Sequence, residues 1–175
     1  MSDFTTSAGL IQPAGGVKAI DLYGNVNFTN PGFLTSNSKV AYRVVWGIRD
    51  ANDNVILGAP SQRAVLTNPL PATPPSSANV DLEIIIPPGV NTNYFYQVYR
   101  SAVVDAGLSP LDEVDPGDEL YLVIEDFPSS SEISAGKIEL FDNTPESFRA
   151  KGALLYTNGI SGEGILQANE PPQIS

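Results

Sequence analysis

The 175-residue sequence contains no cysteine and no histidine, and its 9 basic residues face 20 acidic ones, for a formal net charge of −11. Without Cys and His the chain cannot build a Ser-His-Asp or Cys-His catalytic site, a Cys/His zinc site, a disulfide or a thiolate nucleophile. Nucleic-acid binding draws most of its non-specific affinity from clustered Lys and Arg, which scattered bases do not supply. The sequence therefore predicts a non-enzymatic protein with no catalytic residue, no cofactor and no nucleic-acid partner.

Long apolar runs are also missing. The first residues, MSDFTTSAGLIQPAGG, lack the basic start and the apolar run of about 7 or more residues that a secretory signal needs. No stretch approaches the roughly 18 apolar residues of a membrane span. We therefore expect a soluble, unprocessed chain with no membrane partner, and its 42% hydrophobic content is enough to bury a core.

The apolar runs that are present are short, rich in Val, Ile, Tyr and Phe, and divided by Gly, Pro, Asn and Asp at intervals of roughly 8 to 15 residues, a pattern typical of an all-β sandwich or barrel. The expected strands cover residues 17–28, 39–49, 55–67, 79–86, 93–102, 120–126 and 137–142. Such a set of strands fits a two-sheet sandwich. We predict an N-terminal arm over residues 1–14, the sandwich over 15–144 and a C-terminal docking extension over 145–175.

The clearest hairpin lies between residues 39 and 67. Tyr42, Val44 and Trp46 alternate with the intervening residues, so they share one strand face, which we expect to face the core. The Asn/Asp-rich residues 50–54 form the turn, because these side chains bond their own backbone and tolerate left-handed conformations. The proline-rich residues 69–77 then form an extended crossing.

Aromatic side chains lie on both faces of the strand expected over residues 93–102, so we expect one face to meet a neighbouring loop or chain. Several tyrosines are candidates for stacking on a sugar ring, although cross-strand packing is the commoner role of Tyr in strands. These tyrosines are Tyr23, Tyr94, Tyr96, Tyr99 and Tyr121.

The negative charge is concentrated in residues 103–146, which hold 12 carboxylates and one lysine, while the rest of the chain is neutral. One end or edge of the sandwich should therefore be strongly negative, which would either discourage unwanted strand pairing or steer docking of a basic partner. Residues 103–117 are expected to form a short helix or turn that ends at Pro116 and Gly117.

Two groups of side chains with oxygen atoms can be compared with known types of metal site. Asp50, Asn52 and Asn54 match the first positions of a calcium loop, but Val55 and Ser61 stand where that loop needs Gly and Glu, so a hairpin turn is the preferred interpretation. The densest carboxylate cluster is Asp112, Glu113, Asp115, Asp118 and Glu119. Such a run is usually a solvated surface, and we expect no bound metal.

Two segments carry a resemblance to a known fold family. NYFYQVYRS, which follows VDLEIIIPPGV, resembles the second and third strands of a fibronectin type III-like domain, and AYRVVWGIRDANDNVILGAPS resembles the last hairpin of such domains. The hairpin precedes the strand pair here. The resemblance therefore implies an immunoglobulin/fibronectin type III-like two-sheet sandwich that is permuted or independent, with extended N- and C-terminal arms.

A second resemblance concerns function. ELYLVIED, KIELFDNTPES and GALLYTNGISGEGILQANEPP are similar to segments of tail and other virion structural proteins of tailed bacteriophages. The resemblance carries no catalytic residue across. It implies a protein of the virion, in the tail or neck, that is assembled in the host cytoplasm beside other virion proteins and copies of itself.

We therefore expect a structural virion component whose arms dock on neighbouring subunits. The residues expected at subunit interfaces are Phe4, Leu10, Ile11, Leu154, Leu155, Tyr156, Thr157 and Asn158. The alternative is a module whose sandwich loops bind a host-surface glycan or receptor. A carboxylate glycosidase is a third hypothesis, but 12 carboxylates in one segment make a pair unavoidable by chance.

Overall fold

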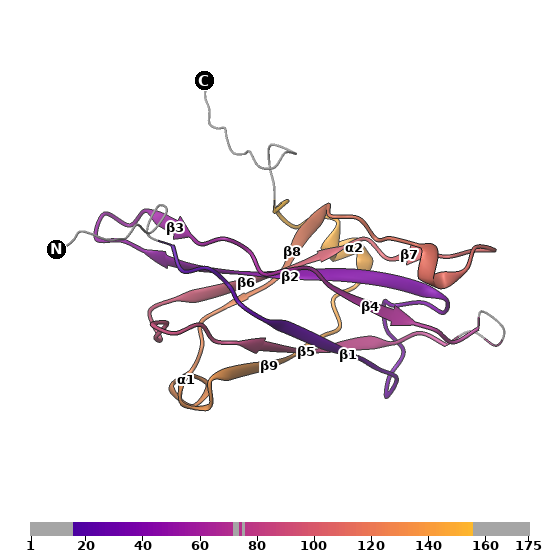
Figure 1. The fold of residues 1–175 in the computed structure, drawn as a ribbon, viewed down its shortest axis with the longest axis horizontal. Helices are drawn as coiled ribbons and strands as arrows, with labels where there is room; N and C mark the ends of the chain where they lie inside the picture. Colours follow the sequence, from indigo (N-terminus) through magenta and orange to yellow (C-terminus); the bar gives the residue numbers. More distant parts are fainter. Residues whose placement is uncertain (1–15, 72–73, 75, 156–175) are drawn as a thin grey trace, which may run out of the picture.

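The computed structural model describes residues 16–71, 74 and 76–155, which form two antiparallel sheets (Figure 1). The smaller sheet has the order β1 (Leu22–Asn27), β5 (Asn79–Ile85), β9 (Lys137–Asp142). The larger sheet has the order β3 (Val55–Leu57), β2 (Ser38–Arg49), β6 (Phe95–Ser101), β8 (Leu120–Asp126), and both β4 (Ala64–Asn68) and β7 (Val104–Asp105) also pair with β2. The predicted all-β architecture is confirmed.

Side chains from the facing sides of both sheets form one core. Tyr42, Val44 and Trp46 of β2 are fully buried, so the prediction for this strand face is confirmed. The Trp46 and Tyr96 rings meet edge to face, with centroids 5.7 Å apart. From the smaller sheet the core takes Val80, Leu82, Ile84 and Ile138. The two sheets are therefore held together mainly by apolar burial, the dominant favourable contribution to folding.

The prediction of a single strand over residues 55–67 is wrong, because this segment forms two separate strands, β3 and β4. Between them the chain bulges but stays attached to β2: the Gly58 amide donates to the Trp46 carbonyl, and the Ser61 hydroxyl accepts from the Val44 amide. Pro60 lies in the middle of the bulge and has no amide hydrogen for a ladder.

The strand expected over residues 17–28 is shorter than predicted, since only Leu22–Asn27 pairs with β5. The residues before it lie beside the opposite sheet, where the Ala19 amide donates to the Ala59 carbonyl at 3.0 Å. A Cβ on Gly58 would collide with the Val17 backbone, so the two segments approach closely. The N-terminal run therefore crosses from the edge of the larger sheet to the smaller sheet.

The predicted turn at residues 50–54 is confirmed and joins β2 to β3. One carboxylate oxygen of Asp50 accepts hydrogen bonds from the Asn52 and Asn54 amides, both at 2.9 Å, and Asp53 takes a left-handed φ of 65°. The bond from the Asn54 amide is the main cause that lowers the pKa of Asp50. Asp50 thus acts as the cap of a hairpin turn, which was the preferred interpretation of this motif.

The acidic loop between β7 and β8 contains one helical turn, η3 (Leu111–Glu113), as expected. Two ion pairs attach this loop to the larger sheet: Arg43 Nε lies 2.9 Å from Asp118, and Arg63 Nη2 lies 2.8 Å from Asp115. Part of the acidic segment is therefore neutralised by arginines of the same chain.

Two short helices, absent from the sequence-based prediction, flank β9. The first is α1 (Ser130–Ala135), which begins with a reciprocal capping box between Ser129 and Glu132 and ends at Gly136, whose φ is 78°. The second is α2 (Glu146–Arg149). In the part of the chain that the structure describes, no helix is long and apolar enough to cross a membrane.

The end of the described chain adds to the free edge of β8. The Leu122 amide donates to the Ala153 carbonyl, and the Leu155 amide donates to the Leu120 carbonyl, both at 2.8 Å. Leu155 also packs against an apolar cluster on the outer face of the larger sheet, made by Ala41, Val45, Tyr99 and Leu120. On the second aromatic face of β6, Tyr99 thus packs in a cluster with the chain's own C-terminal segment, and Phe95 meets the Phe127 ring edge to face.

Candidate functional site

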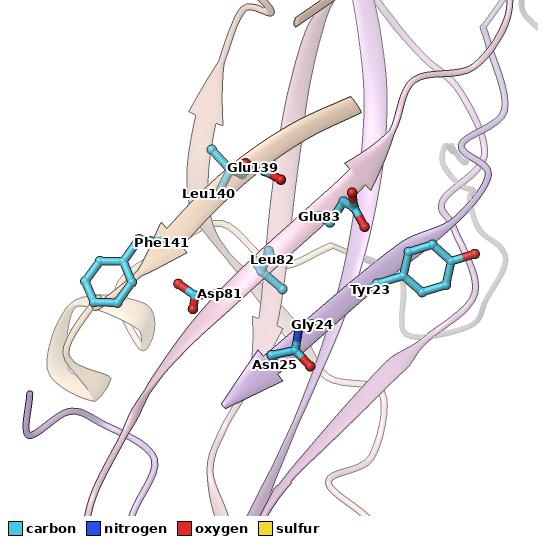
Figure 2. A pocket seen from close by; sticks show the side chains of 9 residues that line it. All are labelled: Tyr23, Gly24, Asn25, Asp81, Leu82, Glu83, Glu139, Leu140 and Phe141. Atoms are coloured by element: carbon cyan, nitrogen blue, oxygen red, sulfur yellow. The ribbon is translucent and has the colours of Figure 1, made fainter. Parts of the chain in front are cut away.

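The outer face of the smaller sheet is hollowed by a depression of about 490 Å³ (Figure 2). It is lined by Tyr23, Gly24, Asn25, Asp81, Leu82, Glu83, Glu139, Leu140 and Phe141. All three strands of the sheet contribute, so the hollow brings together residues that lie more than a hundred positions apart in the sequence.

Strand register explains which side chains point outward. Tyr23 pairs with Glu83, which pairs with Glu139, and these three form one row across the sheet. The next outward row is formed by Asn25, Asp81 and Phe141. Successive side chains in a strand alternate between faces, so the residues between these rows, such as Leu82, point into the core.

Two aromatic rings lie at diagonally opposite corners of this grid, Tyr23 on β1 and Phe141 on β9, with the carboxylates between them (Figure 2). The exposed fractions are 54% for Tyr23 and 46% for Phe141. The nearby Asp21 carboxylate is the main cause that raises the pKa of the Tyr23 hydroxyl, with a smaller contribution from Glu83. Both rings therefore offer apolar surface to water within an acidic environment.

The carboxylates of the hollow are held by other side chains. Lys137 Nζ lies 3.1 Å from Glu83 and 3.5 Å from Glu139, and the hydrogen bond to Glu83 is the main cause that raises the pKa of Lys137. The Asn27 amide group donates to Asp81 at 3.0 Å. These contacts favour defined orientations of the acceptor oxygens.

A second depression, of about 550 Å³, borders the first. Phe141 lines both hollows, and the second is completed mainly by the β1–β2 connection and by residues after β9. Its other lining residues are Asn30, Pro31, Gly32, Phe33, Asn79, Asn143, Pro145 and Glu146. The two hollows therefore adjoin each other at Phe141.

A different cluster of charged groups has a centre that is closed to ligands. Arg100 and Asp142 form an ion pair of 2.8 Å with both side chains fully buried, and the Tyr42 hydroxyl donates to the same Asp142 oxygen at 2.6 Å. Glu146 pairs with Arg100 at 3.0 Å, and the Arg100 guanidinium lies 3.7 Å from the Phe33 ring centroid. Arg100 and Asp142 have no contact with water, so the centre of this cluster links the two sheets and α2 and has no accessible reacting group, whereas Glu146 at its edge lines the second hollow.

Of the residues expected at subunit interfaces, Leu154 and Leu155 lie in the described part of the chain. Leu154 pairs with Tyr121 of β8, and Leu155 packs on the same sheet. The remaining expected interface residues lie outside the described residues: Phe4, Leu10, Ile11, Tyr156, Thr157 and Asn158. The predicted terminal arms lie largely outside them as well.

The candidate stacking tyrosines differ in their environment. Tyr96 and Tyr99 are 2% and 5% exposed, so they pack inside the fold, which is the commoner role of Tyr in strands. Tyr94 and Tyr121 are partly buried, whereas Tyr23 presents its ring to solvent.

The dense carboxylate cluster of the acidic loop has a structural role in part, because Asp115 and Asp118 bind Arg63 and Arg43. Within residues 16–71, 74 and 76–155, no group of three or more acidic side chains has an arrangement that would hold a metal ion. The Arg63 hydrogen bond is the main cause that lowers the pKa of Asp115.

Sequence reasoning identified Tyr23 but missed the partners that complete the hollow. The available signal was the alternation of acidic residues, Asp81 and Glu83, with apolar residues in β5, whereas in β9 only Glu139 follows a polar alternation and Phe141 breaks it. Alternation assigns residues to a face, but only the strand register puts them beside Tyr23.

Comparisons of this chain with protein-family models, with curated proteins and with solved structures find no significant match.

Proposed function

We propose that this chain is a non-enzymatic structural component of a bacteriophage virion, in the tail or neck, which holds neighbouring subunits through its sandwich and its terminal segments. The sequence resemblance to tail and virion structural proteins supports the viral setting. The observation that carries the structural role is the position of the two ends of the described chain, which lie along opposite edges of the larger sheet.

At one edge, the N-terminal residues 16–19 lie beside β3, with the hydrogen bond from Ala19 to Ala59. At the other edge, residues 153–155 pair with β8. A chain segment that adds to a sheet edge forms main-chain hydrogen bonds, a general mode by which proteins bind extended segments. The sequence also contains residues before Gly16 and after Leu155, among them the apolar Leu10, Ile11 and Tyr156, which suit docking on a neighbour.

The distribution of carboxylates supports a non-enzymatic role. Asp142 is buried in the ion pair with Arg100, whereas Glu83 and Glu139 lie on an open sheet face beside Lys137. Neither setting resembles the water-excluding cleft in which paired carboxylates act on glycosidic bonds.

We also infer that the sandwich is of the immunoglobulin/fibronectin type III-like kind in permuted order. In immunoglobulin notation, the order β1-β5-β9 corresponds to strands A-B-E, and β3-β2-β6-β8 corresponds to G-F-C-C′. The F–G hairpin, normally last in the chain, here stands between A and B. This agrees with the order of the resembling segments in the sequence.

The proposal is tested by the composition of purified particles. Virions purified by density gradient and quantified by mass spectrometry are expected to contain a fixed number of copies of this chain per particle. A host cytoplasmic protein of similar abundance serves as the carry-over control. Recovery of the chain only from the free cytoplasmic fraction would overturn the proposal.

The second candidate function is a binding module of the tail that contacts a host-surface glycan or receptor. The exposed rings of Tyr23 and Phe141 beside a polar hollow favour it, because ligand sites combine apolar surface with a few placed polar groups.

A further inference from the structure

We propose that the outer face of the smaller sheet binds an uncharged oligosaccharide, with Tyr23 and Phe141 as stacking platforms for sugar rings and with Asp81, Glu83 and Glu139 as acceptors for sugar hydroxyls. The proposal rests on the second candidate function and names its site and ligand class. It is independent of the assembly role.

The spacing of the two rings suits a chain of sugars. Tyr23 and Phe141 are two strands and two residues apart. With strands about 4.8 Å apart and a rise of about 3.4 Å per residue, their Cα atoms are about 12 Å apart on a flat sheet. A single sugar ring is shorter than this, so two rings of an oligosaccharide stack on the two platforms while the sugars between them lie over the carboxylates.

The carboxylates suit hydroxyl groups. Ionised carboxylates are strong hydrogen-bond acceptors, and each has several lone-pair sites. Lys137 and Asn27 occupy only some of these sites on Glu83, Glu139 and Asp81. The remaining sites accept hydrogen bonds from a sugar without a large rearrangement of side chains, which lowers the entropic cost of binding.

Charge decides between classes of glycan. The outer face has the carboxylates of Asp21, Asp81, Glu83 and Glu139 against the ammonium of Lys137. Sulfated, phosphorylated or sialylated glycans would be repelled by this excess of negative charge. A basic peptide is the competing ligand. Lys137, one row beyond Glu83 and Glu139 at the end of the hollow, already pairs with both carboxylates, so part of their negative charge is neutralised within the chain.

The neighbouring hollow extends the site beyond one pair of sugars. It shares Phe141 and provides the amide side chains of Asn30 and Asn143, which both donate and accept hydrogen bonds. Two adjoining hollows of this composition fit a linear glycan better than a monosaccharide.

The test is a binding titration of the full chain with a panel of neutral hexasaccharides built from glucose, galactose or N-acetylglucosamine, beside a sulfated oligosaccharide and oligolysine. At least one neutral series is expected to bind, and Tyr23→Ala or Phe141→Ala should each weaken that binding about tenfold or more, in line with the loss of one aromatic contact. Phe148→Ala is the matched control, because Phe148 is 61% exposed and lines neither hollow. It should leave the affinity unchanged.

Thermal unfolding of each variant establishes that it is folded, and Tyr23→Phe, which keeps the ring, should retain binding. The proposal is overturned if no neutral hexasaccharide binds, if only oligolysine or the sulfated glycan binds, or if Phe148→Ala weakens binding as much as Phe141→Ala. None of these results bears on the proposed assembly role, which is tested separately by mass spectrometry of purified virions.

Discussion

At the residue scale, breaking the buried ion pair of Arg100 and Asp142 should be strongly destabilising. Arg100→Met would leave the Asp142 carboxylate fully buried without its cation, although the Tyr42 hydroxyl and the Thr144 amide still donate to it. Removing one partner of a buried pair typically destabilises a protein by about 3–5 kcal/mol. Urea unfolding monitored by the fluorescence of Trp46, the single tryptophan, measures the change.

The matched control is Arg49→Met, because Arg49 pairs with Asp53 on the surface and its side chain is 57% exposed. Exposed pairs contribute about 1 kcal/mol or less. Equal losses in the two variants would contradict the role given to the buried pair.

The buried tyrosines predict loss of stability at high pH. Burial is the main cause that raises the pKa of Tyr96 and Tyr99 to about 12 and the pKa of Tyr42 well above 10.0. A phenol whose pKa is higher in the folded than in the unfolded state contributes to the stability of the fold. This contribution is fully present below the unfolded pKa of about 10 and is lost as pH rises through the folded pKa. Urea midpoints measured from pH 9 upward should therefore fall above about pH 10.

A spectrophotometric titration provides the control for this prediction. The exposed Tyr23 should ionise before the three buried tyrosines, and Tyr99→Phe should remove one late-titrating group. A urea midpoint that stays constant between about pH 10 and pH 12 would be inconsistent with these environments.

At the element scale, close backbone contacts fix both terminal segments on the sheet edges. A Cβ on Gly58 would collide with the Val17 carbonyl oxygen, and one on Gly152 would collide with the Leu122 carbonyl oxygen. Since backbone atoms cannot move away as easily as side-chain ends, Gly58→Ala should displace the N-terminal segment and Gly152→Ala the C-terminal segment.

Amide hydrogen exchange measures the two effects separately. Gly58→Ala should accelerate exchange at Ala19 and leave Leu155 protected, whereas Gly152→Ala should do the reverse, so each variant is the control for the other. Acceleration at both edges in either variant would indicate general destabilisation and not local detachment.

The acidic loop between β7 and β8 should depend on its two arginines. Arg63→Gln removes the partner of Asp115 and the donor to the Gly117 carbonyl, and should make residues 106–119 more susceptible to limited proteolysis. Lys18→Gln, at an exposed lysine elsewhere, should not.

The pKa of Asp115 is lowered by Arg63, so the contribution of this pair is present above the ordinary pKa of an aspartate and is lost as pH falls through the lowered folded value. Protection of the loop should therefore decrease in acid in the native chain. A loop in Arg63→Gln that remains as resistant as in the native chain at neutral pH would contradict this anchoring.

Elements with a clear period were predictable from sequence, and elements set by tertiary contacts were not. The alternation of Tyr42, Val44 and Trp46 is sufficient to identify a core-facing strand. The bulge at Gly58 and Pro60 and the crossing at Ala19 depend on which edge of the larger sheet is free to pair. The order of residues in the sequence does not give this information. The capping box of Ser129 and Glu132 followed by Gly136 was a readable signal for α1, but a six-residue helix leaves no apolar period.

At the scale of the whole molecule, the charge asymmetry has a partly internal explanation. Of the acidic segment, Asp115, Asp118, Asp142 and Glu146 bind arginines of the same chain. The predicted negative edge is therefore weaker than the composition of residues 103–146 suggests. The hollow on the smaller sheet was beyond sequence analysis for a related reason: its corner residues Tyr23 and Phe141 come together only when β5 pairs with strands on both sides.

The two faces and edges of the sandwich thus have separate proposed roles. The larger sheet has both terminal segments along its edges, and the smaller sheet presents a polar hollow with exposed aromatic rings. Separation of this kind allows a subunit to be fixed in an assembly by its edges while its opposite face stays accessible.

The central claim is that the terminal segments hold neighbouring subunits, and for contacts between copies of this chain native mass spectrometry of the full chain against a chain of residues 16–155 tests it most directly. We predict that the full chain forms oligomers of defined size at micromolar concentration and that residues 16–155 give only folded monomers. Leu10→Asp and Tyr156→Asp in the full chain should each shift the distribution toward monomer. A full chain that is monomeric under all conditions, or a truncated chain that forms the same oligomers, would contradict the claim that the terminal segments hold copies of this chain together.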